Sequence, residues 1–383
     1  MTDPTRYIES LFLDAACLDH ATTHRIRERL PGLSVEIIHD LDGFLENFRT
    51  SPDPIGKGKR GLLLTKQKGE FVKPCPCTPH YLGCNYFIIN LDLNCPLDCT
   101  YCILQLYLDH PLLTVHVNTE DLWPQLDAFL RRQRGRPLRI GTGELGDSLA
   151  LDPLTHRSCD LIAYFRRHPN VQFELKTKTT NIQNLMDTEP EENIVIAWSL
   201  NSEGSARSEE KDAPAIGSRL EAARKVVSRG YRVGFHFDPL IRSQGWRREY
   251  ARVIDNLLAC IPASRIAWIS LGALRFPAPL KTIIQARHPE SRILYQEFIR
   301  GRDGKLRYFK PHRLEMFRFT ADRIREKGGK DIPLYLCMES REIWRKAIKK
   351  EPEGRQEIES FLALPSGCGS MAAACAAGLD DAD

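Results

Sequence analysis

Short apolar runs alternate with amphipathic stretches through the middle of this 383-residue chain. The runs have the length and the β-branched content of strands, whereas the amphipathic stretches repeat apolar residues at helical spacing. Strands are predicted at residues 86–91, 138–141, 171–176, 194–200, 232–238 and 266–271, and helices at residues 119–132, 152–167, 216–228 and 246–259. Strands joined through helices form parallel sheets, so the pattern predicts an α/β fold, a partial (β/α)6 barrel.

The remaining segments divide the chain into four predicted parts. Residues 1–85 form an N-terminal region, with a strand at 34–39 and a basic, Gly-rich link at 55–60. Residues 86–291 form the barrel. Residues 292–363 form an extension, with a hairpin around the RGRDG segment at 300–304, helices at 311–327 and 340–348, and a short strand at 333–337. Residues 364–383 are rich in Gly, Ala, Ser and Asp, which predicts a disordered tail.

Composition places the chain among soluble globular proteins. Hydrophobic residues make up 42% and charged residues 27%, and no apolar run reaches the roughly 18 residues that a membrane span needs. The first residues lack the basic and apolar segments of a secretion signal, so we expect a cytoplasmic protein. Twelve cysteines then indicate reduced thiols and metal ligation. The net charge of +4 permits nucleic-acid binding without arguing for it.

The stretch NCPLDCTYCILQ, residues 94–105, places Cys95, Cys99 and Cys102 in a CxxxCxxC arrangement. Thiolates at this spacing can converge on one iron–sulfur cluster. A cubane cluster normally takes four thiolates, so three leave one iron open to a ligand that is not protein. Tyr101 would put an aromatic ring beside the cluster. The alternative is a zinc knot or unrelated thiols, but zinc sites usually add a second cysteine pair or histidines, and no histidine follows at such spacing.

A second cysteine group, Cys75, Cys77 and Cys84, lies upstream in KPCPCTPHYLGCNY. It could form an auxiliary metal site, carry redox-active thiols, or pack near the entrance of the cluster. Prolines around the first two cysteines make the segment extended, so these two thiols point to opposite sides and do not suit one ion.

Polar residues also recur where the predicted strands end. Chemistry in such barrels gathers at the C-terminal ends of the strands. The second strand ends in GTGE, whose carboxylate can accept hydrogen bonds from an ammonium group. The candidate pocket residues at the strand ends are Glu144, Lys178, Ser199, Asn201, His236 and Asp238. Lys176 shares a strand face with Lys178, and the sixth strand ends near Ser270, Gly272 and Arg275.

The cysteine motif followed by GTGE resembles the signature of the radical S-adenosylmethionine (SAM) superfamily. The segments CTYCILQ, GTGELGDSLALDPLTH, LKTKTT, AWSLNSE, RVGFHFDPLIRSQGWRREY and RYFKPHR together resemble the spore photoproduct lyase family, over roughly residues 86–313.

This resemblance implies a 4Fe–4S cluster on Cys95, Cys99 and Cys102, and a 5′-deoxyadenosyl radical made by reductive cleavage of SAM. In the lyase that radical abstracts hydrogen from a thymine dimer and reverses the crosslink. The resemblance further implies an electron donor such as flavodoxin or ferredoxin, and damaged DNA as a partner. The implied SAM contacts are Glu144, Lys178, Ser199, Asn201 and Asp238; Tyr101 is implied to act in catalysis, and Arg307 and Tyr308 fall in the hairpin that the lyase uses against DNA.

Two positions depart from the family pattern. The lyase returns a hydrogen atom from a cysteine in a stretch that matches residues 141–147, where this chain offers Glu144 and no cysteine. The lyase has a tyrosine directly after the last cluster cysteine, where this chain has Ile103. Another thiol could substitute: Cys337, in LYLCMES, or one of the group from Cys75 to Cys84. A buried apolar cysteine is the other interpretation of Cys337.

Three functions therefore stay open from the sequence. The first is a radical enzyme acting on a DNA lesion or a nucleobase. The second is a radical enzyme of the same architecture with a non-DNA substrate. The third is an iron–sulfur sensor or binding protein, which would not need polar strand ends to hold SAM.

Overall fold

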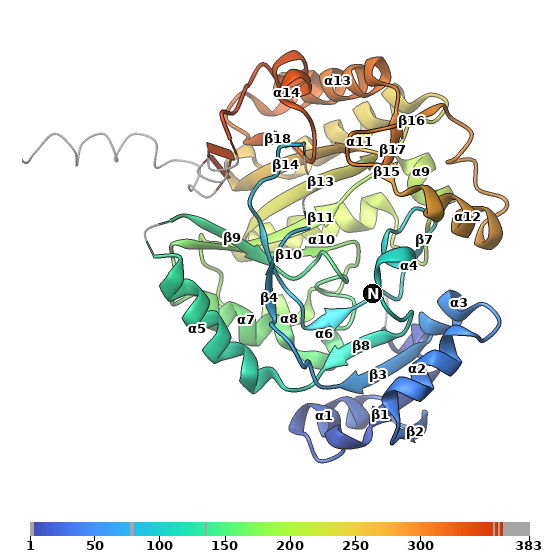
Figure 1. The fold of residues 1–383 in the computed structure, drawn as a ribbon. Helices are drawn as coiled ribbons and strands as arrows, with labels where there is room; N and C mark the ends of the chain where they lie inside the picture. Colours follow the sequence, from blue (N-terminus) through green and yellow to red (C-terminus); the bar gives the residue numbers. More distant parts are fainter. Residues whose placement is uncertain (1–3, 77–79, 135, 355–356, 359–360, 363–383) are drawn as a thin grey trace, which may run out of the picture.

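The computed structural model describes residues 4–76, 80–134, 136–354, 357–358 and 361–362. Its centre is a curled eight-stranded sheet in the order β18-β14-β13-β11-β10-β9-β5-β4 (Figure 1). The strands from β5 to β18 pair in parallel, and β4 joins the edge in the antiparallel direction. The bounds are β4 (Val72–Pro74), β5 (Phe87–Ile89), β9 (Leu138–Gly141), β10 (Val171–Thr177), β11 (Ile194–Ser199), β13 (Arg232–Leu240), β14 (Ile266–Ala273) and β18 (Leu334–Leu336). The predicted partial barrel is confirmed.

Amphipathic helices cover the outside of the curled sheet (Figure 1). They are α5 (Leu122–Arg132), α7 (Arg157–Phe165), α10 (Ile216–Arg229), α11 (Trp246–Cys260) and α13 (Lys310–Gly328). Three further helices are α8 (Gln183–Met186), α9 (Glu203–Glu209) and α12 (Ala278–Arg287). The prediction of a single helix at residues 152–167 is wrong, because the structure has two helices there. The segment divides into α6 (Asp152–Thr155) and α7, because His156 adopts a left-handed conformation with φ 54°.

The core of the barrel follows from strands that are covered on both faces. All eight residues of β14 are buried, as parallel strands between helices and a packed interior require. Trp198 on β11 and Trp268 on β14 are among the largest fully buried side chains. Each buried aliphatic or phenylalanine side chain contributes about 1.5–3 kcal/mol to the transfer term of folding.

A second sheet lies below the barrel in Figure 1, in the order β2-β1-β3-β8-β6. Its strands are β1 (Ser10–Asp14), β2 (Ser34–Ile38), β3 (Gly61–Thr65), β6 (Asp92–Leu93) and β8 (Leu113–His116), and α1 (Ala21–Arg29) and α2 (Leu41–Arg49) accompany it. The sequence analysis predicted β2 and missed the other strands. Since β6 and β8 come from the range assigned to the barrel, this sheet draws on both sides of residue 85, and that division stays a prediction.

The segment expected as a Gly-rich link at residues 55–60 is mostly helical, and that prediction is wrong. It forms α3 (Pro54–Gly58), which begins where the side chain of Asp53 accepts a hydrogen bond from the backbone N–H of Gly56 at 3.0 Å. Proline at the first helical position has the φ that a helix needs and lacks an N–H that would be left without a partner there. The helix delivers Lys59 into the interior, where it is 3% exposed.

The C-terminal extension contains a small sheet in the order β15-β17-β16, formed by β15 (Arg275–Phe276), β16 (Phe298–Arg300) and β17 (Leu306–Tyr308). The predicted hairpin is therefore confirmed, as are the helix that becomes α13, the short strand β18 and the last helix, α14 (Arg341–Ile348). Cys77 and the tail at residues 364–383 lie outside the described residues. Among the described helices none combines the length and the apolar character that crossing a membrane demands.

Candidate active site

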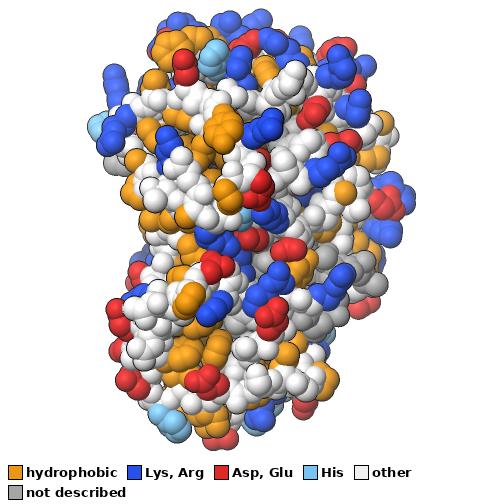
Figure 2. All heavy atoms as spheres, turned by 90° about the vertical axis from the view of Figure 1, so that its right-hand side faces the viewer, with side chains coloured by type: hydrophobic (Ala, Val, Ile, Leu, Met, Phe, Trp, Pro, Cys, Tyr) orange, Lys and Arg blue, Asp and Glu red, His pale blue; other side chains and the backbone are white. Residues whose placement is uncertain are grey.

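A cavity of about 320 Å³ opens at the C-terminal ends of the barrel strands, where the sequence analysis placed the chemistry. Every parallel strand contributes to its wall, either with its last residues or with the loop that follows. The predicted site residues in the wall are Cys95, Cys99, Tyr101, Cys102, Glu144, Lys178, Ser199, His236, Asp238 and Cys337. Cys75 and Cys84 also line the cavity. On the molecular face in Figure 2, Lys and Arg side chains are interspersed with Asp and Glu around a shallow waist.

The cysteine loop follows β5 and lies against the cavity. Cys95 and Cys99 are buried, Cys102 is half-buried, and all three belong to one apolar cluster with Tyr101. Burial raises the pKa of the Cys95 thiol well above its usual range and that of Cys99 to about 12. Thiols in this environment stay protonated until a bound cation replaces the proton.

The three thiols fit a cluster better than a single ion. Among the described residues, no group of three or more His, Cys, Asp or Glu side chains closes tightly enough to hold one metal ion. A cubane presents a separate iron to each thiolate, so its ligands need not meet at one point. Three soft thiols that share a cavity wall, with open space beside them for a further ligand, suit a 4Fe–4S cluster.

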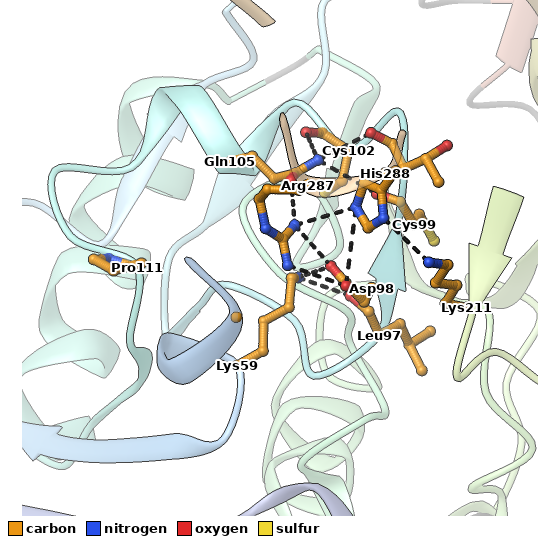
Figure 3. A network of polar contacts seen from close by, with 12 residues as sticks. Lys59, Leu97, Asp98, Cys99, Cys102, Gln105, Pro111, Lys211, Arg287 and His288 are labelled. Carbon is orange, nitrogen blue, oxygen red and sulfur yellow. Dashed lines mark hydrogen bonds and ion pairs between the residues drawn. The ribbon is translucent and has the colours of Figure 1, made fainter. Parts of the chain in front are cut away.

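Hydrogen bonds to its backbone, from another strand and from a side chain, fix the shape of this loop (Figure 3). The short strand β7 (Asp98–Cys99) pairs with β12 (Glu210–Lys211) in the antiparallel direction. The amide of Gln105, in α4 (Leu104–Tyr107), donates to the carbonyl oxygens of Thr100 at 3.0 Å and Cys102 at 3.2 Å. The loop therefore keeps its conformation through contacts with several parts of the chain.

Tyr101 and Lys178 share one buried acid, Glu210. The Tyr101 hydroxyl donates to Glu210, which pairs with Arg219 at 2.6 Å. The Nζ atom of Lys178 lies 5.6 Å from the centre of the Tyr101 ring. Burial would lower the pKa of Lys178, but Glu210 and Cys99 outweigh it and raise that pKa. Lys178 therefore presents a positive charge to the cavity beside the cysteine loop.

Glu144 forms an ion pair with Lys176 in the cavity wall. Burial would lower the pKa of Lys176, but Glu144 and Glu174 raise it. The glycines of the GTGE segment lie close to neighbouring side chains. A Cβ at Gly141 would lie 1.9 Å from the Tyr86 hydroxyl, and one at Gly143 would lie 2.7 Å from the Lys176 Cβ. The small residues make room for protein side chains.

Asp238 and Cys337 meet at Arg275, which follows β14. The guanidinium donates to the two carboxylate oxygens of Asp238 at 2.9 and 3.1 Å, and its Nη2 atom lies 3.3 Å from the Cys337 Sγ. Burial would raise the pKa of Asp238, but Arg275 lowers it, with a smaller contribution from Cys337. The Cys337 thiol thus lines the cavity in a polar environment and is not packed in a purely apolar core.

Charged residues also form the floor of the cavity. The His236 Nε2 and Glu174 Oε1 atoms lie 2.6 Å apart, and Arg139 lies 3.6 Å from the second oxygen of Glu174. The Arg139 guanidinium stacks over the Trp268 ring at 4.2 Å. Burial would raise the pKa of Glu174, but His236 and Arg139 lower it strongly. An ionised acid between two basic groups therefore lies at the centre of the barrel.

Three predicted site residues are buried and do not line the cavity. Asn201 is 0% exposed and lies behind the cavity wall, where its amide carbonyl accepts hydrogen bonds from Tyr250 at 2.5 Å and from the Ser202 N–H at 2.9 Å. A direct contact with SAM would break this packing. The Asn201 side chain instead supports the turn after β11.

Arg307 and Tyr308 are each 1% exposed, so neither side chain is accessible in this structure, and their contact with DNA stays a prediction. Arg307 pairs with Asp303 at 2.5 Å across the hairpin turn and stacks over the Tyr81 ring at 4.0 Å. The Tyr308 ring stacks on Phe298, with 5.1 Å between the ring centres. Both faces of this strand are covered.

The strand-end rule found Lys176 and Arg275 without giving either a role, and sequence reasoning missed Arg139 as a residue of the site. Arg139 lies inside an apolar run, and an arginine at such a position is itself a signal, because a buried charge needs a partner.

Comparison with known proteins gives a consistent result. A family model described as spore photoproduct lyase matches residues 83–321, more than half of the chain. The spore photoproduct lyase of Bacillus subtilis (strain 168) is 25% identical over 300 residues, which cover 75% of this chain and 84% of that protein. The one from a Geobacillus species is 26% identical over 210 residues, which cover 54% of this chain and 62% of that protein.

Solved structures share the fold. A spore photoproduct lyase mutant superimposes with a TM-score of 0.75 at 22% identity, covering 86% of this chain and 98% of that one. A second mutant, with bound AdoMet and dinucleoside spore photoproduct, gives a TM-score of 0.73 at 21% identity, covering 87% and 99%. Since the family model matches more than half of the sequence and the barrel carries its cysteine loop at the expected place, this chain belongs to the spore photoproduct lyase family of radical SAM enzymes.

Proposed function

We propose that this protein cleaves SAM reductively and uses the resulting radical on a thymine lesion in DNA or a related nucleobase substrate. One observation carries the proposal. The cysteine loop after β5 and the Cys337 thiol after β18 come from the first and last parallel strands, and both line one cavity. Reversing a thymine crosslink by radical chemistry needs a radical source and a hydrogen-atom donor within reach of one substrate.

The cofactor side of the cavity follows from its charges. Cys95, Cys99 and Cys102 would hold a 4Fe–4S cluster, which when bound supplies the electron that cleaves SAM to methionine and a 5′-deoxyadenosyl radical. The Lys178 ammonium would pair with the SAM carboxylate, and the Glu144 carboxylate has an oxygen to accept from the SAM ammonium. Ser199 and Asp238 line the same wall and would bind SAM hydroxyl groups.

Cys337, which lines the same cavity, would complete the reaction. Its S–H bond breaks homolytically, the hydrogen atom forms a C–H bond on the product radical, and the sulfur keeps the unpaired electron. A thiol can perform this transfer because its S–H bond is weaker than the C–H bond formed. Arg275 holds the sulfur in place through its Nη2 atom. Glu144 occupies the place of the family donor, and a carboxylate has no such weak bond.

A second candidate function is a radical SAM reaction on a substrate other than DNA. The ion pair of Glu144 with Lys176 and the charged floor of Glu174, His236 and Arg139 favour it. Buried charges at the bottom of a substrate cavity match a ligand with polar groups that reach deep into the barrel.

The electron for SAM cleavage must come from outside this chain. We infer a one-electron protein donor of the flavodoxin or ferredoxin type, because the chemistry needs a strong biological reductant. A cytoplasmic location fits this donor and the many reduced thiols.

One assay separates the candidates. Anaerobically purified protein with its cluster is incubated with SAM, dithionite and the dinucleoside spore photoproduct, and both 5′-deoxyadenosine and repaired thymidines are measured. Repair with 5′-deoxyadenosine formation supports lesion repair. Formation of 5′-deoxyadenosine without repair supports the second candidate. A protein that binds iron and SAM but yields no 5′-deoxyadenosine would contradict both candidate functions. It would instead support an iron–sulfur sensor or binding protein.

A further inference from the structure

A buried lysine from the N-terminal sheet region supports the cysteine loop from behind. The Lys59 Nζ donates hydrogen bonds to the carbonyl oxygens of Cys95 at 3.0 Å and Leu97 at 2.8 Å (Figure 3). Lys59 is 3% exposed and follows α3, outside the residues that match the family model. The residue therefore reaches the predicted ligand loop from a part of the chain to which the family match assigns nothing.

The loop carries one acid in this region, Asp98, and three basic side chains surround it. Arg287, at the end of α12, donates to both Asp98 oxygens at 3.1 Å, and Lys59 lies 4.0 Å from the first of them. The His288 ring lies 3.9 Å from the second oxygen (Figure 3). Arg287 also pairs with Asp53 at 3.4 Å, but the Asp53 side chain is 63% exposed, so solvent screens its charge more strongly than the charges beside the loop. Lys59 and Arg287 share Asp98 as their little-exposed acid, so positive charge outweighs negative charge directly behind the loop.

Burial strengthens the effect of this charge on neighbouring groups. An ammonium inside a protein is screened far less than one on the surface, so its field acts on groups several ångströms away. Its cost of burial is met here by the two carbonyl oxygens and Asp98. Moving the backbone between Cys95 and Leu97 would break both hydrogen bonds, so Lys59 also fixes the direction of that backbone.

We propose that Lys59 is a positioning residue for the iron–sulfur cluster, and that with Arg287 it raises the reduction potential of that cluster. The proposal rests on the assignment of Cys95, Cys99 and Cys102 as cluster ligands under the proposed function. The reduced cluster carries one more negative charge than the oxidised cluster. A fixed positive charge behind its ligand loop therefore favours the reduced form.

The test measures iron content and the cluster midpoint potential, by EPR-monitored titration without SAM or substrate. Lys59→Met keeps the length of the side chain and removes its charge. It should lower the reduced-to-oxidised ratio at a fixed potential about tenfold, which for a one-electron couple is about 59 mV toward more negative potential. Lys59→Arg keeps the charge and should stay closer to the wild type. Lys57→Met, at an exposed position of the same helix, is the matched control and should shift nothing.

A second substitution separates electrostatics from damage to the loop. Asp98→Asn removes the acid and leaves the charges of Lys59 and Arg287 uncompensated, so it should shift the potential in the opposite direction, to less negative values. A loop that was merely disturbed would not respond with opposite signs to the two changes. Lys59→Met could fail to take up iron. In that case, iron uptake by Lys59→Arg together with a less negative potential in Asp98→Asn supports the proposal, and the absence of either contradicts it.

Equal potentials and iron contents in the wild type and Lys59→Met would overturn the proposal, as would shifts of the same sign in Lys59→Met and Asp98→Asn. The proposed function fails separately, in a protein that binds its cluster and shows these shifts but does not cleave SAM. A wild type that takes up no iron would overturn both proposals.

Discussion

The Nη2 atom of Arg275 lies 3.3 Å from the Sγ atom of Cys337, while the same guanidinium holds both oxygens of Asp238. A thiol in this arrangement is oriented by a group that is itself fixed by two further hydrogen bonds. Cys337 thereby differs from a cysteine that fills apolar space, because its sulfur has a defined polar neighbour and lines the cavity. The predictions below begin with this thiol.

Cys337→Ala should leave SAM cleavage in place and change the fate of the substrate. Without a hydrogen donor, the product radical should be trapped as an adduct, so repair should fall at least tenfold while 5′-deoxyadenosine still forms. Product analysis by mass spectrometry measures both. Cys260→Ala, at a half-buried cysteine of α11, is the control. Unchanged repair in Cys337→Ala and in changes of Cys75 and Cys84 would show that none of these thiols is the donor.

Cys99→Ala should abolish the brown colour of the anaerobic protein and its SAM cleavage. Wild type should bind about four irons per chain, because a cubane contains four. The loss follows from the removal of one of three thiolates, and iron analysis with the visible absorption spectrum measures it. Cys159→Ala, away from the cavity, should keep the cluster. A colourless wild type loaded with zinc would contradict the cluster assignment.

Glu144→Ala should weaken SAM binding about tenfold or more, since a hydrogen bond to a charged group contributes about 1.5–3 kcal/mol. Equilibrium dialysis with the cluster-loaded protein gives the dissociation constant. Glu144→Gln keeps the shape and one acceptor oxygen, and should lie between the wild type and Glu144→Ala. Glu144→Cys should not restore lyase activity, because it gives up the same contact. Undiminished affinity in Glu144→Ala would remove this residue from the SAM site.

Arg307→Leu should destabilise the fold rather than weaken DNA binding selectively. It removes the cation of the buried Arg307–Asp303 ion pair, which costs about 3–5 kcal/mol. Urea unfolding of Arg307→Leu measures this loss. Arg302→Ala, at an exposed position of the same hairpin, should change stability by less than about 0.5 kcal/mol. An Arg307→Leu protein with wild-type stability would contradict the structural role.

Stability should fall as the pH drops from about 6.5 to 4, in part through His116. Burial and the nearby Arg157 lower the pKa of His116 to about 4. In this pH window the unfolded chain binds a proton on that ring and the folded chain does not, so acid favours unfolding, by up to roughly 3 kcal/mol below the folded pKa. Urea midpoints at pH 7 and pH 5 measure the loss. His116→Gln should reduce it, and an equal loss in the variant would exclude His116 as a source.

The barrel could be predicted because each of its strands and helices is indicated by residues close together in the sequence. Each strand is an apolar run bounded by turns, and each helix repeats apolar residues on one face, so residues 138–141 could be placed without knowing their neighbours. The cavity followed for the same reason, since strand ends converge in any parallel barrel. The N-terminal sheet was not predictable this way, because β3 and β8 pair across a long separation in sequence.

The burial of Arg307 and Tyr308 could not be predicted from the sequence, for a physical reason. Arg307 and Tyr308 are neighbours on β17, and alternation along a strand would expose one of them. Tyr81 and Phe298 cover the two faces, and no local pattern in the sequence reports either contact. Lys59 was assigned to a link because glycines surround it. Only the combination of Asp53 and Pro54 before it signals the start of a helix.

The strands β6 and β8 lie on either side of the cysteine loop in the sequence. Both belong to the five-stranded N-terminal sheet, whereas β5, before the loop, belongs to the barrel. A shortened chain that began at residue 83, where the family match starts, would keep β6 and β8 but lose β1, β2 and β3, and β8 would lose its parallel pairing with β3. It would also uncover the apolar side chains of β8 and leave an unpaired edge prone to aggregation. The start of the family match at residue 83 is therefore not a place where this protein can be cut, and expression or crystallisation of the barrel requires the whole N-terminal sheet.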